Sequence, residues 1–246
     1  MHRCECNLAN STNYFVTFAS GNIKDSAGNA YSGTTTYDFT TIAASATTIF
    51  TASDDTITGD AGNNTLDGGG GIDCVTYTGN RANFTVTASG TGFIVTDNVG
   101  TSGTDTMNNI ERLSFTDGTL ALDISGTSGQ MYRLYKAAFN RAPDTAGLGW
   151  NIGLVDGGLT LAQMSAAFVA SAEFTSTYGD LTNARFLDQL YLNVLGRPAD
   201  AAGAAWNLNL LDTNAVDRPG MLAAYSESAE NQLALIGQIQ DGIWFT

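Results

Sequence analysis

A short glycine-rich stretch carries the residues whose types and spacing could bind a metal ion. Asp55, Asn64 and Asp73 follow one another at intervals of nine residues, and an aliphatic residue stands two positions after each. Calcium takes oxygen ligands, which short acidic side chains and the carbonyls of tight turns supply, and glycine permits the dihedrals of such turns. The pattern therefore predicts a calcium site. The predicted ligand residues are Asp55, Asp73, Asn64, Gly59, Gly62, Gly68 and Gly71.

The same nine-residue repeat predicts the elements that position these ligands. Each repeat is typical of a short parallel strand followed by a glycine-rich turn, with the aliphatic residue (Ile57, Leu66 or Val75) pointing inward. One repeat forms about half a coil, so residues eighteen apart stack on the same edge. We expect Asp55 and Asp73 to flank one ion and Asn64 to lie on the opposite edge. The alternative is a glycine-rich loop between domains.

This stretch resembles the repeats-in-toxin (RTX) family, the hemolysin-type calcium-binding repeats of bacterial proteins exported by type I secretion. About two and a half repeats are present, and Asn64 stands where the family usually has aspartate. The resemblance implies a short parallel β-roll that binds one or two calcium ions, and a secretion signal near the C-terminus, at residues 242–246. The residues that carry it are Gly59, Gly62, Gly68, Gly69, Gly71 and Asp73.

Composition limits the classes of partner. The chain has 246 residues, 43% hydrophobic and 10% aromatic, which is enough for one or two folded cores. A formal net charge of −14 argues against nucleic acid and anionic membranes as partners. No run of eighteen apolar residues is present, so we expect no membrane span, and residues 1–10 lack the apolar core of a signal peptide.

Catalytic constellations are missing from the sequence. The single histidine, His2, pairs with no nucleophile pattern, and neither a zincin helix nor a phosphate-binding loop occurs. The three cysteines, Cys4, Cys6 and Cys74, form no disulfide framework, and His2 with Cys4 and Cys6 matches no zinc spacing. We expect no enzyme activity in this chain.

The first 41 residues show two alternating apolar patterns, at 14–18 and 35–39, which predict two β-strands. The stretch resembles the last part of a bacterial Ig-like domain, and this implies that residues 1–41 are the C-terminal remnant of such a β-domain. We expect a longer protein upstream, with residues 1–6 a boundary artefact. The residues that carry the resemblance are Tyr14, Val16, Phe18, Gly21, Ile23, Asp25, Ala27, Gly28, Asn29, Tyr37, Phe39, Thr40 and Thr41.

Residues 42–125 are predicted to form one β unit. Residues 42–53 are a Thr/Ala/Ser-rich link into the repeats, and alternating apolar residues then predict four strands within 84–124. We interpret these strands as an antiparallel cap over the open end of the roll. Asp97, Asp105 and Asp117 could bind ions, although turn formation is the favoured interpretation of all three.

From residue 126 onward the apolar period changes from 2 to 3.6, which predicts a helical domain over 126–246. Thr160–Gln163 is a capping box, Gly157 and Gly158 are a stop, and Asp217 is a helix start. The region contains an internal duplication, with copies at about 130–180 and 186–240. The recurring residues, at an offset of 56, are Tyr135, Phe139, Arg141, Asp144, Gly147, Trp150 and Asn151.

The shared words of the two copies resemble the helical module known as domain of unknown function 4214, which often accompanies RTX repeats. The paired Arg141 and Arg197, with Trp150 and Trp206, could bind an anionic sugar. The competing interpretation is structural: an aspartate caps each helix, the arginine holds the loop, and the tryptophan packs on the buried face. The duplication favours the structural interpretation.

The predicted architecture is therefore a multidomain chain, β then α: an Ig-like remnant, a short parallel β-roll with an antiparallel cap, and a duplicated all-α domain. We expect an extracellular or cell-surface bacterial module that folds on calcium, with the helical domain as a scaffold or adhesion unit. Its partners would be surface polysaccharide or other cell-surface proteins. The alternative is the non-catalytic accessory and secretion region of a larger secreted hydrolase or polysaccharide-modifying enzyme.

Overall fold

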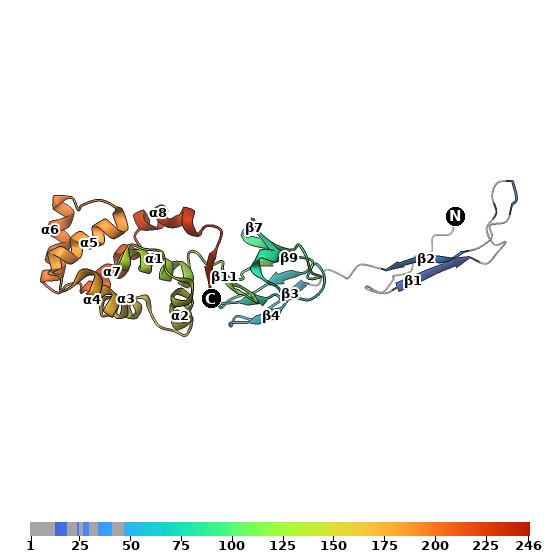
Figure 1. Cartoon of the computed structure of the whole chain (residues 1–246), viewed down its shortest axis with the longest axis horizontal. Coiled ribbons are helices and arrows are strands. Elements are labelled where there is room, and N and C mark those ends of the chain that lie inside the picture. The colour runs from blue at the N-terminus through green and yellow to red at the C-terminus, as the bar shows by residue number, and fades with distance from the viewer. Residues whose placement is uncertain (1–12, 19–23, 25–26, 30–33, 41–46) are drawn as a thin grey trace.

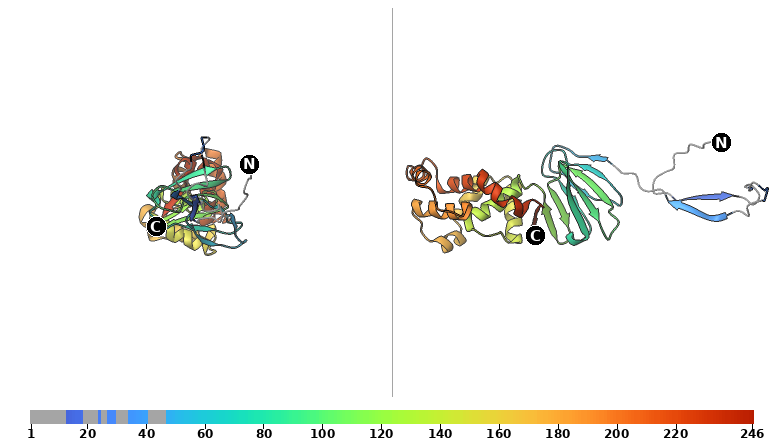
Figure 2. Two further views of the ribbon diagram at one scale, coloured as in Figure 1. Left: turned by 90° about the vertical axis from the view of Figure 1, so that its right-hand side faces the viewer. Right: turned by 90° about the horizontal axis from the view of Figure 1, so that it is seen from above.

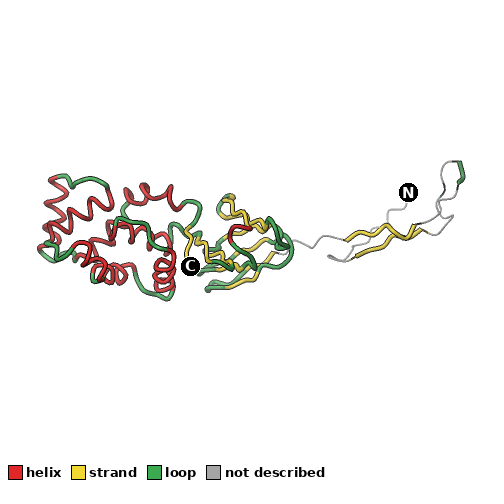
Figure 3. Tube along the Cα trace, viewed as in Figure 1, coloured by secondary structure: helices red, strands yellow, loops and turns green. Residues whose placement is uncertain are grey.

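β-strands are followed by helices, as the change of apolar period predicts (Figure 1). The computed structural model describes residues 13–18, 24, 27–29, 34–40 and 47–246. The nine strands of 47–121, here called the β-unit, form two five-stranded sheets together with a strand at Ile243–Phe245. The helices of 127–239, here called the helical unit, lie beside these sheets (Figures 1 and 3). No helix in the described ranges is long and apolar enough to cross a membrane.

The N-terminal part contains a pair of strands at the predicted positions. Strands β1 (Asn13–Phe18) and β2 (Thr34–Thr40) are antiparallel, with Tyr14 opposite Phe39 and Val16 opposite Tyr37. This pairing agrees with two strands of a β-domain. His2, Cys4 and Cys6, considered above as metal ligands, lie outside the described residues.

The β-unit begins with four three-residue strands that alternate between its two sheets. β3 pairs in parallel with β5 and β4 with β6, and both registers join residues eighteen apart, such as Thr56 with Cys74. This is the stacking that the nine-residue repeat predicts. β3 falls inside the stretch that was predicted to be a link, so that part of the prediction was wrong. The strands are β3 (Thr47–Ile49), β4 (Thr56–Thr58), β5 (Thr65–Asp67) and β6 (Cys74–Thr76).

The remaining strands extend both sheets, which corrects the prediction of an antiparallel cap. β9 and β10 continue the parallel stacking on β5 and β6. β8 and then β7 add antiparallel to β9, and β11 adds antiparallel to β10. The sheet orders are β12-β11-β10-β6-β4 and β3-β5-β9-β8-β7. These strands are β7 (Phe84–Ser89), β8 (Gly92–Asp97), β9 (Thr104–Asn108), β10 (Arg112–Phe115) and β11 (Gly118–Ala121).

The core of the β-unit lies between its two sheets. Leu66 and Val75, two of the predicted inward positions, are buried, and Ile57 on the edge strand β4 is half-buried. Aromatic rings also belong to this core: the ring of Tyr77 stacks on that of Phe115, with 5.7 Å between their centroids. Because one repeat cannot bury its apolar face alone, this core forms only when the coils stack.

The helical unit consists of two successive sets of four helices. The first helical set is α1–α4 and the second is α5–α8; corresponding helices begin 56 or 57 residues apart, and the first three of each set have equal lengths. The helices are α1 (Thr127–Phe139), α2 (Thr145–Asp156), α3 (Leu161–Val169), α4 (Ala172–Tyr178), α5 (Asn183–Leu195), α6 (Ala201–Asp212), α7 (Arg218–Ser226) and α8 (Ala229–Ile239).

Side-chain caps begin most of these helices. The Asp144 carboxylate accepts a hydrogen bond from Gly147 N, and Asp200 does the same for Gly203 N in the second set. Thr160 and Gln163 form the predicted capping box, and Asp217 begins α7. Each cap satisfies a backbone donor that would otherwise lack a partner and stabilises its helix by about 1 kcal/mol.

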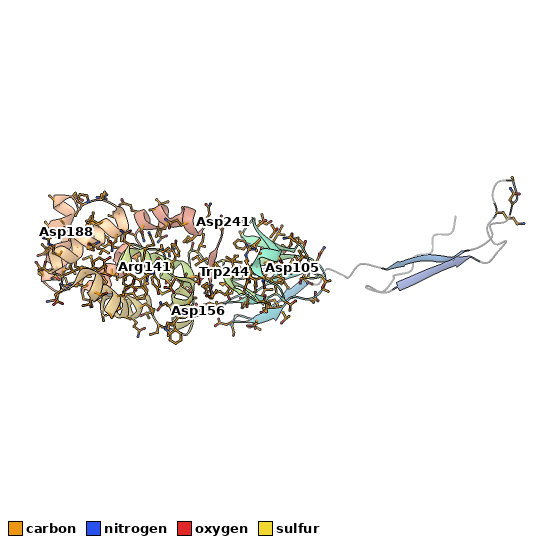
Figure 4. The ribbon with its side chains drawn as sticks, in the orientation of Figure 1. Asp105, Arg141, Asp156, Asp188, Asp241 and Trp244 are labelled. Carbon is orange, nitrogen blue, oxygen red and sulfur yellow. The ribbon has the colours of Figure 1, made fainter. Side chains whose placement is uncertain are left out.

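The last residues of the chain tie the helical unit to the β-unit. Strand β12 (Ile243–Phe245) adds antiparallel to β11, and Ile243 packs in the helical core while Trp244 packs on the core of the β-unit. Figure 4 shows Trp244 where helices and sheets meet, and the second view of Figure 2 shows the two units end to end. The tail that was predicted as a secretion signal is therefore a sheet strand in the folded chain.

A buried arginine holds the same junction. Arg112 of β10 is 5% exposed, donates to the Asp123 carboxylate, and contacts Asp156 Oδ2 at the end of α2 with 3.1 Å between Nη2 and the oxygen. Its Nη2 also donates to Thr127 Oγ1, in the first turn of α1. One guanidinium thus joins a strand of the β-unit to two helices.

Replacing Arg112 by methionine should lower the free energy of unfolding by about 2–3 kcal/mol, because it leaves two carboxylates without their buried cation. Chemical denaturation of the whole chain measures this. The matched control is Arg197→Met, whose pair with Glu230 is exposed and should contribute less than about 1 kcal/mol. Equal losses in the two variants would contradict this role of Arg112.

Candidate metal site

One edge of the stacked coils carries a column of carboxylates. Asp55, Asp73 and Glu111 occupy successive coils, each directly before its parallel strand. Asp73 Oδ1 accepts from Asp55 N at 2.9 Å, and Glu111 Oε2 accepts from Asp73 N at 2.8 Å. The column is thus bonded from one coil to the next. Asp55 and Asp73 lie on the same edge, as predicted.

The opposite edge repeats the arrangement with Asn64 and Asp105. Asn64 N donates to Asp105 Oδ1 at 2.9 Å, and the Tyr77 hydroxyl donates to Asp105 Oδ2 at 2.7 Å. Both oxygens of this fully buried carboxylate therefore have a donor. Figure 4 shows Asp105 inside the β-unit. The favoured prediction that Asp105 forms a turn was wrong, because the residue lies within strand β9 and its side chain is in the core.

Asp73 differs from Asp105 in one respect. It is equally buried, but its Oδ2 has no hydrogen-bond partner. Burial raises the pKa of the Asp73 carboxyl; the bond from Asp55 N opposes this, while the negative charges of Asp55, Asp54 and Asp67 raise the pKa further. A buried carboxylate oxygen without a donor is costly unless a cation or proton reaches it.

A glycine packs tightly against this oxygen. A Cβ atom on Gly68 would lie 2.5 Å from Asp73 Oδ2 and 1.9 Å from the Asn109 carbonyl oxygen. Gly68 is therefore required by close approach. The two oxygens both lie against Gly68, and both are the hard donors that calcium prefers. Within the described residues, no group of three or more His, Cys, Asp or Glu side chains is gathered as a metal cluster.

Two further glycines show how the turns stack. Gly69 and Gly71 have φ angles of +84° and +115°, and a Cβ on Gly69 would lie 2.3 Å from the Thr51 carbonyl oxygen. Gly69 and Gly71 allow the turn before β6 to lie directly on the turn before β4. Asp55 Oδ2 accepts from Thr51 N and Oγ1, so this carboxylate oxygen is occupied within its own turn.

The predicted ligands thus divide into two groups. Asp55, Asp73, Gly68 and Gly71 lie together at one edge, whereas Asn64 lies at the other, where its Nδ2 donates to Asp60 Oδ1. Gly62 approaches Gly103 on the edge of Asn64, and Gly59 contacts the ring of Tyr77. These last three residues belong to the self-contained edge.

Glu111 and Asn109 were missed by the sequence analysis. They follow Asp73 by 38 and 36 residues, because the insertion of β7 and β8 breaks the interval of eighteen. Burial raises the pKa of Glu111, the bond from Asp73 N opposes this, and the charge of Asp73 adds to the rise. The sequence did contain a signal for Glu111. It is an acidic residue directly before the strand β10, just as Asp55 and Asp73 stand directly before β4 and β6. Asp97 and Asp117 accept backbone N–H bonds in turns, as favoured.

The paired residues of the helical unit confirm one half of the structural interpretation and correct the other. Arg141 makes a two-pronged pair with Glu173, and Arg197 contacts Glu230, so both arginines hold loops. The tryptophans were predicted to be buried, but Trp150 is 73% and Trp206 66% exposed. Each stands on the outer face of its helix, α2 or α6, so neither is explained by packing.

Two families match parts of this chain. Residues 164–235, from α3 into α8, match the family described as Domain of unknown function (DUF4214), and residues 4–41 match the bacterial Ig-like domain. A search of the curated proteins gives no match. These two resemblances are confirmed. Neither match covers the glycine-rich stretch, so the RTX resemblance stays a prediction.

Gly68→Ala should destabilise the chain by about 2 kcal/mol, because its Cβ would collide with the Asn109 carbonyl and the Asp73 carboxylate. Gly70→Ala is the matched control, since a Cβ there meets its nearest atom, Ala52 Cα, at 3.7 Å. Urea denaturation compares the two variants. If Gly70→Ala proves as costly as Gly68→Ala, close packing around Gly68 is not what makes its substitution costly.

Proposed function

We propose that this protein is a calcium-binding structural module, in which one ion at the Asp73 edge completes a short parallel β-roll. The observation that carries the proposal is the contrast between two buried carboxylates. Asp105 Oδ2 accepts a hydrogen bond from the Tyr77 hydroxyl, whereas Asp73 Oδ2 has no donor and lies beside Gly68. A divalent cation would satisfy it and offset the repulsion from Asp54, Asp55 and Asp67.

The residues that would hold the ion are Asp73, through Oδ2, and Asn109, through its carbonyl, with Glu111 as the neighbouring charge. Calcium would supply positive charge there, and these oxygens would be among its ligands. The registers of eighteen residues and the glycine turns support the β-roll interpretation. The ion binds a folded edge that the unfolded chain lacks, so its binding free energy adds to the stability of the fold.

A secreted protein has a use for such coupling. With a net charge of −14, the acidic side chains repel one another when calcium is scarce. A calcium concentration typical of the extracellular space favours the folded, calcium-bound β-unit. The match of residues 4–41 to a bacterial Ig-like domain supports a surface or extracellular location. The RTX resemblance adds export by type I secretion to this proposal.

The helical unit would act as an interaction unit that arose by duplication. The equal helix lengths and the matching caps at Asp144 and Asp200 support the duplication. Trp150 and Trp206 occupy corresponding positions, and both are exposed. An exposed indole costs solvation free energy without stabilising the fold, and its flat face stacks well on sugar rings or on partner side chains. A second candidate function is therefore carbohydrate binding through these tryptophans.

Calcium should raise the free energy of unfolding of the whole chain by about 2.7 kcal/mol at a hundredfold excess over its Kd. Calorimetric titration should show about one ion per chain, with a Kd between about 10⁻⁴ and 10⁻³ M. Asp73→Asn keeps the size of the side chain but removes its charge, and it should abolish both the heat of binding and the stabilisation.

Asp105→Asn is the matched control, because it alters an equally buried carboxylate whose oxygens are already occupied. This variant should be less stable than the wild type yet keep its response to calcium. Magnesium at the same concentration should stabilise less, since it prefers six rigid ligands and releases its water reluctantly. An identical melting temperature with calcium and with chelator would rule out the proposal.

Trp150→Ala and Trp206→Ala should leave the free energy of unfolding within about 0.5 kcal/mol of the wild type, because both side chains are exposed. On an array of bacterial polysaccharide fragments, each variant should bind more weakly than the wild type, and the double variant should not bind. Leu233→Ala alters another exposed apolar side chain and should bind normally. Unchanged binding in the double variant would eliminate the carbohydrate-binding candidate.

A further inference from the structure

A pocket opens in the second helical set, away from the candidate metal site. It has a volume of about 280 Å³. Its walls are largely apolar, and a few polar side chains converge on it. The lining residues used here are Leu195, Asn207, Leu210, Met221, Tyr225 and Glu230.

The first helical set shows what such a place can hold. Phe139 is the counterpart of Leu195, and its ring lies 5.3 Å from that of Phe168 and 6.5 Å from that of Phe174, measured between centroids. Phe139 and Phe168 belong to the core of the helical unit. At the corresponding positions the second set has Leu195, Tyr225 and Asn231 in place of the three phenylalanines.

The second set therefore lacks two aromatic rings that the first set has, and Leu195, the counterpart of Phe139, lines the pocket. Asn231 is itself engaged, since its Nδ2 donates to the Ser226 carbonyl at 2.7 Å. Tyr225 is held in position as well: its ring packs against Tyr191, and its hydroxyl accepts from Asn207 Nδ2 at 2.9 Å. These contacts fix the walls, so the pocket is preformed.

We propose that this pocket binds a monocyclic aromatic ring, in the position that the ring of Phe139 takes in the first helical set. A dry apolar cavity of roughly 150 Å³ is enough to bind benzene, so the volume here admits a ring with a substituent. The apolar wall of Leu195, Leu210 and Met221 removes the ring from water. Asn207 and Tyr225 offer hydrogen bonds to a hydroxyl group on it.

The mouth of the pocket is looser than its counterpart. Arg141 stacks over the Phe139 ring and forms two bonds of 2.9 and 3.1 Å with Glu173. Arg197 reaches Glu230 through one nitrogen only, at 3.3 and 3.5 Å. Because Glu230 lines the pocket, this exposed pair can separate to admit a ligand without breaking a buried contact.

Methionine methyl groups provide paired reporters for the test. Met221 lines the pocket, and Met164 is its counterpart in the first helical set; both are buried. The chain has only five methionines, so a methyl NMR spectrum of the whole protein is simple. Titration with toluene or p-cresol should shift the Met221 signal in a saturable way and leave the Met164 signal unchanged.

Two reciprocal variants make the comparison sharp. Leu195→Phe supplies the missing ring and should weaken binding at Met221 at least about tenfold, which is 1.4 kcal/mol. Phe139→Leu removes the ring from the first set and should create a new saturable shift at Met164. If Leu195→Phe does not fold, Ala224→Leu fills the same pocket from the α7 wall.

A third probe, N-acetyl-phenylalanine amide, distinguishes two natural ligands: an aromatic side chain of another protein and a free aromatic compound. Binding at least about tenfold tighter than that of toluene would indicate an aromatic side chain of another protein; otherwise a free compound is the natural ligand, and either result supports the proposal. No Met221 shift with any of the three probes would overturn it, as would an unchanged shift in both filling variants. Calcium affects none of these outcomes.

Discussion

Carboxylates that accept the backbone N–H of the neighbouring coil hold the β-unit together. The bonds from Asp55 N to Asp73, from Asp73 N to Glu111, and from Asn64 N to Asp105 connect successive turns at both edges. Strands of three residues form few ladder bonds, so the turns contribute much of the cohesion between coils. A bond to a charged acceptor is worth about 1.5–3 kcal/mol, but burying the charge raises its free energy. The β-unit thus depends on whether each carboxylate is fully satisfied.

The two edges solve this problem differently. At one edge, the Tyr77 hydroxyl reaches Asp105 Oδ2 from within the core, and the same ring stacks on Phe115, so charge satisfaction and packing are combined in one side chain. At the other edge, Gly68 occupies the place beside Asp73 Oδ2, and the oxygen has no donor. A side chain at residue 68 would collide with backbone, so residue 68 cannot supply the missing donor. Asp73 is thus the member of the carboxylate column that the donors of the chain leave incompletely satisfied.

Much of this architecture follows from sequence patterns. The nine-residue period predicted the interval between stacked strands and the burial of Leu66 and Val75, and the capping residues predicted the starts of α2, α3, α6 and α7. Contacts across insertions were not predictable. Glu111 bonds to Asp73 in the column, but β7 and β8 are inserted between them in the sequence and break the interval of eighteen residues. Nor does a helical period show which outer face is exposed, which is why Trp150 was misplaced. Strand β12 has three residues, too few for any pattern, and only its pairing with β11 defines it.

The helical unit shows the same kind of difference as the two edges of the β-unit: one of two equivalent places is completed by a side chain of the protein, and the other is not. The first three helices of its two sets have equal lengths, and α2 and α6 begin with the same aspartate cap, as expected if folding alone constrained them. The sets differ where one fills its interior and the other does not. Phe139 completes the first set from within, as Tyr77 completes one edge of the β-unit, whereas Leu195 leaves a pocket whose walls are fixed by Asn207 and Tyr225. A core under selection for stability alone would be filled, because an unfilled apolar cavity loses packing contacts. A difference confined to one of two equivalent places therefore indicates a requirement other than folding, and binding is the requirement that an open, preformed pocket can meet.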